Sequence, residues 1–313
     1  MGVRFMNKSF GRRLGRDLKY NTALYFMVIP VVVWYILFVY KPMFGSIMAF
    51  FDYSPVRGYE KSTWVGLEYF VTYLGGRNFP KNLRNTLVHS FCTLFIGFPS
   101  AVVLALLLNE VRVKWFKKTV QTLTYLPHFV SLVVCMQLVK QFCMADTGLF
   151  NDIIVMLGGE RASLLQIPSL YMPIYVLSGI WKEIGWSTII YLAALSAVDE
   201  QLYEAARLDG AGRLKQAIHV TIPGIMPTLV IRFIMNVGTI MSVGYEKSLL
   251  LYNDSVMEVA DIISTYMYRI GIGGAIKMYG LSAAVDLFNA LCNVMLVVLA
   301  NKISRKTTES SLW

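Results

Sequence analysis

The segment EAARLDGAGRLKQAIHVTIP, from Glu204 to Pro223, is polar and basic, although it lies between two long apolar runs. The chain around it is 56% hydrophobic, has a mean hydropathy of +0.54, and carries charge on only 15% of its residues. Soluble domains usually have about 25% charged residues. The composition therefore predicts a protein that crosses a membrane several times, with the 204–223 segment at the membrane surface between two crossings.

Six apolar runs are long enough to cross a bilayer. A helix rises about 1.5 Å per residue, so roughly 20 apolar residues span a hydrocarbon layer about 30 Å thick. Away from the ends of these runs, the charged residues are Lys182, Glu183, Arg232 and Asp286. We expect an all-α membrane protein whose six transmembrane helices lie at about 22–43, 84–109, 119–140, 168–196, 221–245 and 281–301.

The basic residues predict which side of the membrane each loop faces. Sixteen of the 29 Lys and Arg residues lie in four short segments, which alternate with longer loops on the other side. Because short loops rich in Lys and Arg stay in the cytoplasm, we expect both termini and the 204–223 segment to be cytoplasmic. The first apolar run follows a basic stretch but has no small-residue cleavage site, so it is expected to be retained. These expectations divide the chain into a basic N-terminus at 1–21, a membrane domain at 22–301 and a cytoplasmic tail at 302–313.

The sequence shows no motif for catalysis, metal binding or nucleotide binding. It lacks the G-x-x-x-x-G-K-[ST] phosphate loop and the HExxH and GxSxG motifs. The three histidines are scattered and the four cysteines have no CxxC spacing, so neither a metal site nor a disulfide framework is indicated. The net charge of +10 comes from short clusters between apolar runs, which argues against nucleic-acid binding. We therefore expect a protein that is not an enzyme and holds no cofactor of its own.

The order of residues in the 204–223 segment is similar to a motif of a known protein family. Glu-Ala-Ala at 204–206 is followed after three residues by Gly210, and after nine more by Val-Thr-Ile-Pro at 220–223. This order resembles the signature loop of permeases from binding-protein-dependent ABC importers. The residues suit a short helix at 202–209 that Gly210 terminates, and a second helix at 212–219. The resemblance implies a coupling loop at 199–223 that docks on an ATPase subunit, with the contact residues Glu204, Ala205, Ala206, Asp209, Gly210 and Pro223.

Other stretches extend the resemblance over nearly the whole chain. Five further stretches are similar to segments of carbohydrate importers of the maltose type, namely Asn85-Thr86-Leu87, 64–70, 191–195, 244–252 and 263–266. The last two of these resemble a branch of these importers that handles oligosaccharides and polysaccharide fragments. The resemblance implies the type I importer permease fold in a bacterial cytoplasmic membrane. It also implies four kinds of partner: a second permease, expected to be a different chain; two ATPase subunits that use ATP and Mg; an extracytoplasmic solute-binding lipoprotein; and the sugar itself.

The expected sugar path lies at the middle of the fourth and fifth spans. Sugars offer C–H faces and hydroxyls together, so aromatic and polar side chains recognise them jointly. The resemblance points to a W-x-G-x-x-aromatic segment that this chain replaces with WKEIGW, and to two polar positions in the next span. The candidates are Trp181, Lys182, Glu183, Trp186, Asn236 and Thr239. The alternative for the tryptophans is an interfacial belt. Arg232 and Asp286 are expected to form structural ion pairs, with each other or with the partner permease, and His128 to mark a helix kink or pack against the partner.

Two other functions stay open at this stage. The same signature loop occurs in importers of anions and amino acids, which would need unpaired basic residues along the path. A membrane sensor that does not transport anything is a further alternative.

Overall fold

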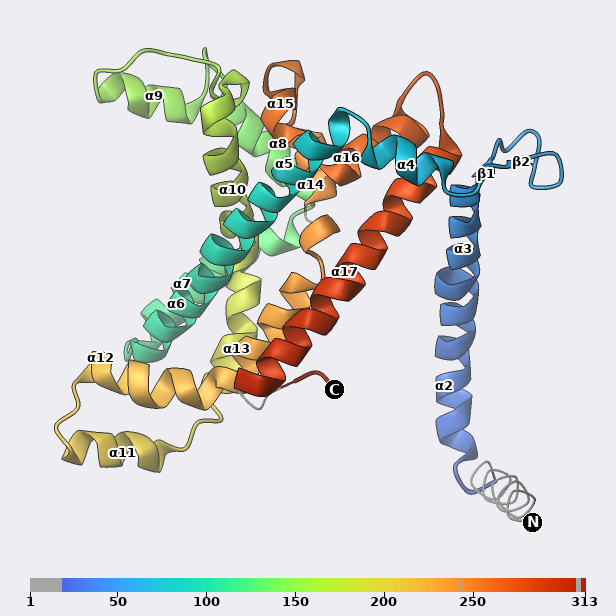
Figure 1. Ribbon diagram of the computed structural model, residues 1–313. Coiled ribbons are helices and arrows are strands. Elements are labelled where there is room, and N and C mark those ends of the chain that lie inside the picture. The colour runs from blue at the N-terminus through green and yellow to red at the C-terminus, as the bar shows by residue number, and fades with distance from the viewer. Residues whose placement is uncertain (1–18, 243, 308–310) are drawn as a thin grey trace.

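The computed structural model describes residues 19–242, 244–307 and 311–313, and the fold in these ranges is almost entirely helical (Figure 1). The first eighteen residues, which carry most of the basic N-terminal cluster, lie outside the described residues. One short antiparallel pair, β1 (Phe51–Asp52) with β2 (Thr63–Trp64), is the only sheet within the described ranges. The all-α prediction is confirmed.

Four helical runs are long and apolar enough to cross a membrane. The first joins α2 (Thr22–Tyr35), η1 (Ile36–Tyr40), α3 (Lys41–Met43) and η2 (Phe44–Phe50). The second joins α5 (Asn78–Cys92), η3 (Thr93–Gly97) and α6 (Phe98–Glu110). The third joins α12 (Arg213–Gln216), η5 (Ala217–Thr221) and α13 (Ile222–Val237). The fourth is α17 (Tyr279–Thr307).

The run expected at 119–140 is broken. It consists of α7 (Lys114–Phe129) and α8 (Leu132–Phe142), which meet at an angle of 103°. Pro127 lies in the last turn of α7, and Ser131 begins α8 by accepting a hydrogen bond from the Val134 amide. Proline weakens the helix and serine caps a new one, so the chain turns here. Counted as one span, this pair makes five apolar spans.

The sixth expected span coincides with α10 (Pro168–Leu195), which has 28 residues and runs alongside the other long helices (Figure 1). It has the length of a span but is less apolar than the others, because it contains the Lys182–Glu183 pair and several Ser and Tyr residues. Six spans therefore remain a prediction, whereas four or five follow from length and composition.

The long helices other than α2 pack into one bundle around three apolar clusters. Tyr191 of α10, Ile225 of α13 and Ala101 of α6 are each almost fully buried where these three helices meet. Helix α2 has no buried residue and stands apart from the bundle in Figure 1. It approaches the rest of the chain only at its upper end, next to α17 and α4.

The connecting segments gather at the two ends of the bundle. Helix α11 (Glu200–Leu208) and the start of the α12–α13 run lie at the same end as the start of α2 and the last turn of α17 (Figure 1). The opposite end carries the remaining short elements: α4 (Glu68–Leu74), α9 (Leu149–Met156), η4 (Leu164–Gln166), η7 (Asp254–Val256), α15 (Met257–Ala260), α16 (Ile263–Tyr268) and η8 (Arg269–Gly273). Two others, η6 (Ile240–Ser242) and α14 (Tyr245–Leu251), continue from α13.

Candidate functional site

The EAA segment forms an exposed helix, α11, as its sequence predicts. Asp199 caps its first turn by accepting a hydrogen bond from the Gln201 amide at 2.9 Å. Gly210 follows the helix with a φ of +76°, a left-handed conformation that glycine adopts without strain. No residue of α11 is buried, and Glu204, Ala205 and Asp209 are fully accessible while Ala206 is half-buried. The helix therefore presents a charged and small-residue surface to a partner.

Two side-chain contacts tie this loop to the helical bundle. The Tyr203 hydroxyl of α11 donates to Thr221 Oγ1 at 3.0 Å, and Thr221 is buried in η5. Arg213 of α12 lies 3.7 Å from a carboxylate oxygen of Glu110 at the end of α6. Pro223 stands in the first turn of α13, directly after η5. The loop is thus connected to α13 through a π-helical turn, a feature that often marks functional positions.

A cavity of about 320 Å³ lies near the middle of the bundle. It is lined by residues of α5, η3, α6, α10, α13 and α14. Its lining residues on α10 extend from Tyr175 to Tyr191, around the middle of that 28-residue helix. The wall combines aromatic and polar side chains, namely Phe98, Tyr175, Tyr191, Ser90, Thr93, Glu183, Ser187, Arg232, Asn236, Thr239 and Lys247.

A polar cluster braces the broken span beside this cavity. Lys182 Nζ donates to the carbonyl of His128 at 3.1 Å, in the last turn of α7, where a cation also favours the helix dipole. Glu183 accepts from His128 Nδ1 at 2.8 Å and lies 3.3 Å from Lys182 Nζ. The His128 ring stacks on Trp186 with centroids 4.4 Å apart. These contacts hold α10 against the bend between α7 and α8.

The structure separates the predicted path residues into two groups. Glu183, Asn236 and Thr239 line the central cavity. Lys182 is not among its lining residues; it is buried behind Glu183. Trp186 covers His128, and Trp181 lines a different, apolar pocket with Phe142, Phe150, Ile174 and others. The aromatic groups of the cavity are therefore Phe98, Tyr175 and Tyr191 instead of the two tryptophans.

Two basic residues of the cavity were not expected there. Lys247 was placed in an outer loop by the span count, but α13 ends at Val237 and α14 begins after Gly244, whose φ is +60°. Helix α14 thus begins close to the cavity and places Lys247 in its wall. Arg232 was expected to pair with Asp286; it faces the cavity instead, and in the part of the chain that the structure describes neither residue takes part in an ion pair.

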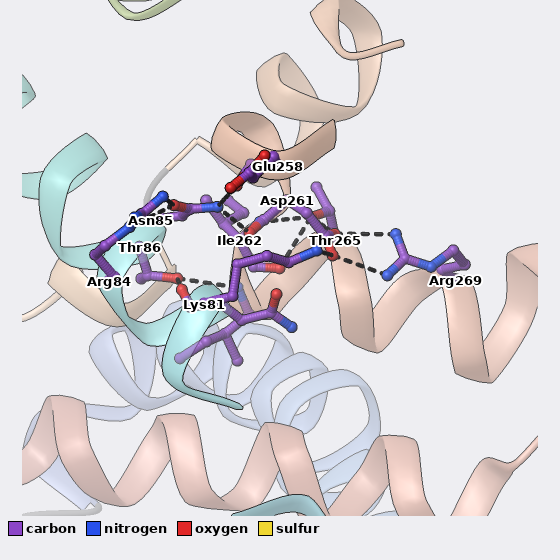
Figure 2. Close-up of polar contacts among 11 residues, drawn as sticks. Lys81, Arg84, Asn85, Thr86, Glu258, Asp261, Ile262, Thr265 and Arg269 are labelled. Atoms are coloured by element: carbon purple, nitrogen blue, oxygen red, sulfur yellow. Dashed lines mark hydrogen bonds and ion pairs between the residues drawn. The ribbon is translucent and has the colours of Figure 1, made fainter. Parts of the chain in front are cut away.

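At the end of the bundle opposite α11, a buried carboxylate anchors the 254–273 segment to α5 (Figure 2). Asp261 is fully buried and accepts two hydrogen bonds from Arg269, at 3.0 and 2.9 Å, and one from Thr265 at 2.9 Å. Lys81 Nζ lies 3.8 Å from the same carboxylate. Hydrogen bonding to Asp261 raises the pKa of Arg269 above its usual value, so the guanidinium keeps its positive charge.

The Asn85-Thr86 pair noted in the sequence completes this anchor. Asn85 Nδ2 donates to the carbonyls of Glu258 and Asp261 at 2.7 and 3.0 Å. Thr86 Oγ1 accepts from the amide of Ile263 at 2.9 Å and thereby satisfies the first turn of α16 (Figure 2). The start of α5 and the segment that follows α14 are thus fastened together at one point.

Comparison with known proteins agrees with this arrangement. A family described as "Binding-protein-dependent transport system inner membrane component" matches residues 69–308. The chain is 44% identical to the polygalacturonan/rhamnogalacturonan transport system permease protein YteP of Bacillus subtilis (strain 168), over 96% of this chain and 94% of that protein. It is 41% identical to Protein LplB of the same organism, over 95% of this chain and 92% of that protein.

The chain is also similar, over almost its full length, to chains in solved structures of ABC transporters. A crystal structure of a bacterial ABC transporter involved in the import of the acidic polysaccharide alginate contains a chain that superposes with a TM-score of 0.86 at 40% identity. That match covers 95% of this chain and 99% of the other. A chain from the bacterial alginate ABC transporter in complex with an alginate pentasaccharide-bound periplasmic protein gives a TM-score of 0.87 at 39% identity, over 96% and 100% of the two chains.

Proposed function

Because the chain belongs to the family of binding-protein-dependent transport system inner membrane components, we propose that it is the membrane permease through which an ATP-driven importer passes an oligosaccharide. The observation that carries this proposal is the central cavity, which joins aromatic walls to hydroxyl, amide and charged groups halfway along the spans. Its relatives over almost the full length include permeases named for polygalacturonan, rhamnogalacturonan and arabinooligosaccharides.

The proposal assigns α11 to the contact with an ATPase subunit. Its small residues, the exposed Ala205 and the half-buried Ala206, let a groove of a partner close over the helix, and Glu204 offers a carboxylate for a charge-assisted hydrogen bond. Closure of the ATPases would push α11, and the motion would reach α13 and the cavity through η5. In this scheme ATP and Mg bind the ATPase subunits. The present chain contributes the path for the sugar and the helix, α11, that transmits the motion of the ATPases.

A second permease completes the path in this proposal. The cavity is bounded by one chain here, and α2 offers a run of 29 residues, Thr22–Phe50, whose most apolar stretch buries nothing against its own bundle. The start of α2, the end of α17 and α11 lie at one end of the molecule (Figure 1). We place this end in the cytoplasm, because the short basic loops belong to it. The opposite end then receives the solute-binding protein.

Reconstitution tests the function directly. We expect proteoliposomes that contain this chain, its partner permease and its ATPase to accumulate a labelled pentasaccharide only when ATP and the loaded binding protein are both present. Uptake of labelled phosphate or amino acid in its place would identify the importer as one for small anions or amino acids. Docking of the binding protein without uptake of any solute would favour a sensor.

The coupling role of α11 has its own test. Glu204→Arg reverses the charge on the proposed contact, so we expect ATPase activity stimulated by the loaded binding protein to fall by about tenfold or more, the usual effect of losing a charged hydrogen bond. Lys306→Glu, an exposed charge reversal in the last turn of α17 and outside α11, is the control. Unchanged stimulation in Glu204→Arg would remove α11 from the coupling path.

A further inference from the structure

The positive charges of the central cavity indicate the kind of sugar that enters it. We propose that Arg232 and Lys247 bind a carboxylate of the cargo, so that the importer selects acidic oligosaccharides, those with uronic acid units, over neutral ones. This inference rests on the proposed function and adds to it the chemistry of the substrate. The cavity wall carries these two cations and a single anion, Glu183.

Arg232 has hydrogen-bonding capacity that the protein does not use. Its guanidinium lies beside the Tyr191 hydroxyl, but its Nε is buried and has no hydrogen-bond partner. A buried donor without a partner is unfavourable, and a charged residue at the centre of a bilayer costs about 2.5–3.5 kcal/mol on insertion scales. A planar guanidinium with a donor that the protein leaves unpaired matches a carboxylate better than it matches a sugar hydroxyl. Arg232 is therefore placed as a carboxylate ligand.

Lys247 brings a second cation to the same space. Its ammonium group donates to the carbonyl of Tyr175 and lies 4.1 Å from the centre of the Tyr175 ring. Position 179 on α10 is a glycine, and a Cβ added there would lie 2.6 Å from Lys247 Nζ. The missing side chain at Gly179 thus leaves the ammonium its place in the wall. Neither Lys247 nor Arg232 forms an ion pair with any residue that the structure describes.

The one acidic residue of the wall is already compensated. The two carboxylate oxygens of Glu183 are directed to His128, at 2.8 Å, and to Lys182, at 3.3 Å. Its negative charge is therefore balanced within the polar cluster behind the cavity. The remaining charge on the wall is positive, and a neutral sugar would leave it without a partner. An anion that also carries hydroxyls and C–H faces satisfies Arg232, Lys247 and the aromatic groups together.

The carboxylate could come from a sugar acid or from a small free anion. The aromatic side chains Phe98, Tyr175 and Tyr191 line the same cavity and favour a cargo with apolar faces as well as charge. A full-length structural relative, 40% identical, takes part in the import of an acidic polysaccharide. We therefore commit to the sugar acid and let the experiment separate it from a free anion.

Binding to the purified complex of the two permeases and the ATPase tests the inference without the selectivity of the binding protein. The probes are an alginate pentasaccharide, a galacturonate pentasaccharide, their carboxyl-reduced neutral counterparts, and inorganic phosphate. By calorimetry we expect at least one acidic pentasaccharide to bind at least about tenfold more tightly than its neutral counterpart, because a charged hydrogen bond is lost in the latter. Phosphate is expected to bind weakly.

Three variants locate the effect. Arg232→Gln and Lys247→Gln remove one cation each, and each should lower the acidic-to-neutral preference by about tenfold. Gly179→Ala keeps both charges but displaces the ammonium, and the mobile end of the lysine can yield without disturbing the fold, so the preference should fall here as well. Lys118→Gln, on the exposed surface of α7, is the matched control and should keep the preference. Arg232→Lys retains a charge if the glutamine variant does not assemble.

The possible outcomes are distinct. Preference for the acidic pentasaccharide that the three variants reduce and the control does not supports the inference. Equal binding of acidic and neutral pentasaccharides would overturn it and leave the proposed function intact. Binding of phosphate with no binding of any pentasaccharide would overturn both.

Discussion

Single residues decide how the end of this permease opposite α11 is held together. Asn85 and Thr86 use side-chain amide and hydroxyl groups to satisfy the backbone of the 258–263 segment, more than 170 positions further along the chain. Asp261 turns the same segment toward α16 and gathers Arg269, Lys81 and Thr265 around its carboxylate (Figure 2). The Asn-Thr pair at the start of the second span is therefore a structural anchor with a defined partner.

Removing the Asp261 charge should loosen this anchor. Asp261→Asn keeps the shape but leaves Arg269 without its carboxylate, and hydrogen bonds to charged groups contribute about 1.5–3 kcal/mol each. We expect a lower midpoint of thermal unfolding for the detergent-purified chain. Asp152→Asn breaks a solvent-exposed pair with Arg161 and should change stability by less than about 1 kcal/mol. Equal midpoints for the two variants would contradict the assignment.

The residues that line the central cavity could be predicted only in part from the sequence. Glu183, Asn236 and Thr239 could be predicted because the resemblance to carbohydrate importers implies a sugar path in the fourth and fifth spans. Lys247 could not, because it lies beyond the expected end of the fifth span at residue 245, and only the placement of α14 brings it to the cavity. Trp181 and Trp186 were candidates through their side-chain type, but α10 directs one to an apolar pocket and the other onto His128.

At the scale of elements, the EAA helix and its link to α13 carry the most information. The helix, its glycine terminator and the proline after it could all be read from the sequence, since they depend on local conformation. The π-helical turn η5 and the contact between Tyr203 and Thr221 depend on how α11 folds back on the next span. This contact joins the exposed helix to the run that carries Arg232 and Asn236.

A double-mutant cycle tests that contact as the transmission point. Tyr203→Phe and Thr221→Val each remove one hydroxyl, and we expect each to reduce sugar transported per ATP hydrolysed by about two- to tenfold, as the net value of one hydrogen bond implies. The double variant should be no worse than either single one, because both break the same bond. Ser196→Ala, whose hydroxyl bonds within its own helix, is the control. Additive losses would show that the two residues act separately.

The bent pair α7–α8 shows the limit of apolar patterning for elements. The run at 119–140 is apolar throughout, so composition predicts one continuous span. Pro127 and Ser131 mark the bend of 103°, and Lys182 of α10 donates to the last turn of α7 beside it. Tertiary contacts of this kind have no signal in the local sequence.

At the scale of the whole molecule, α2 is the element that the bundle does not use. Its apolar side chains are exposed along its length, including Leu24 at 61% and Val32 at 47%. Such a helix can face lipid or a protein partner, and in an importer with two permeases its position beside the bundle suits contact with the second one. The apolar run could be predicted from the sequence, but its separation from the bundle could not.

Cross-linking distinguishes the two surroundings of α2. In a variant without native cysteines, Val32→Cys should form cross-links to the partner permease in the assembled complex, since an apolar helix with no internal contacts is free to pack on it. Ala284→Cys, buried inside the bundle on α17, should form none and serves as the control. Exclusive labelling of Val32→Cys by lipid-dissolved reagents, without a protein cross-link, would assign α2 to the bilayer.

The exposed α2 also bears on how cells handle this chain before it is assembled. None of its residues is buried against the part of the chain that the structure describes. A copy synthesised in excess of its partner would keep this helix uncovered, where membrane quality-control proteases can recognise it. Subunit stoichiometry would then be set by degradation of orphan copies, with α2 as the degradation signal that assembly conceals.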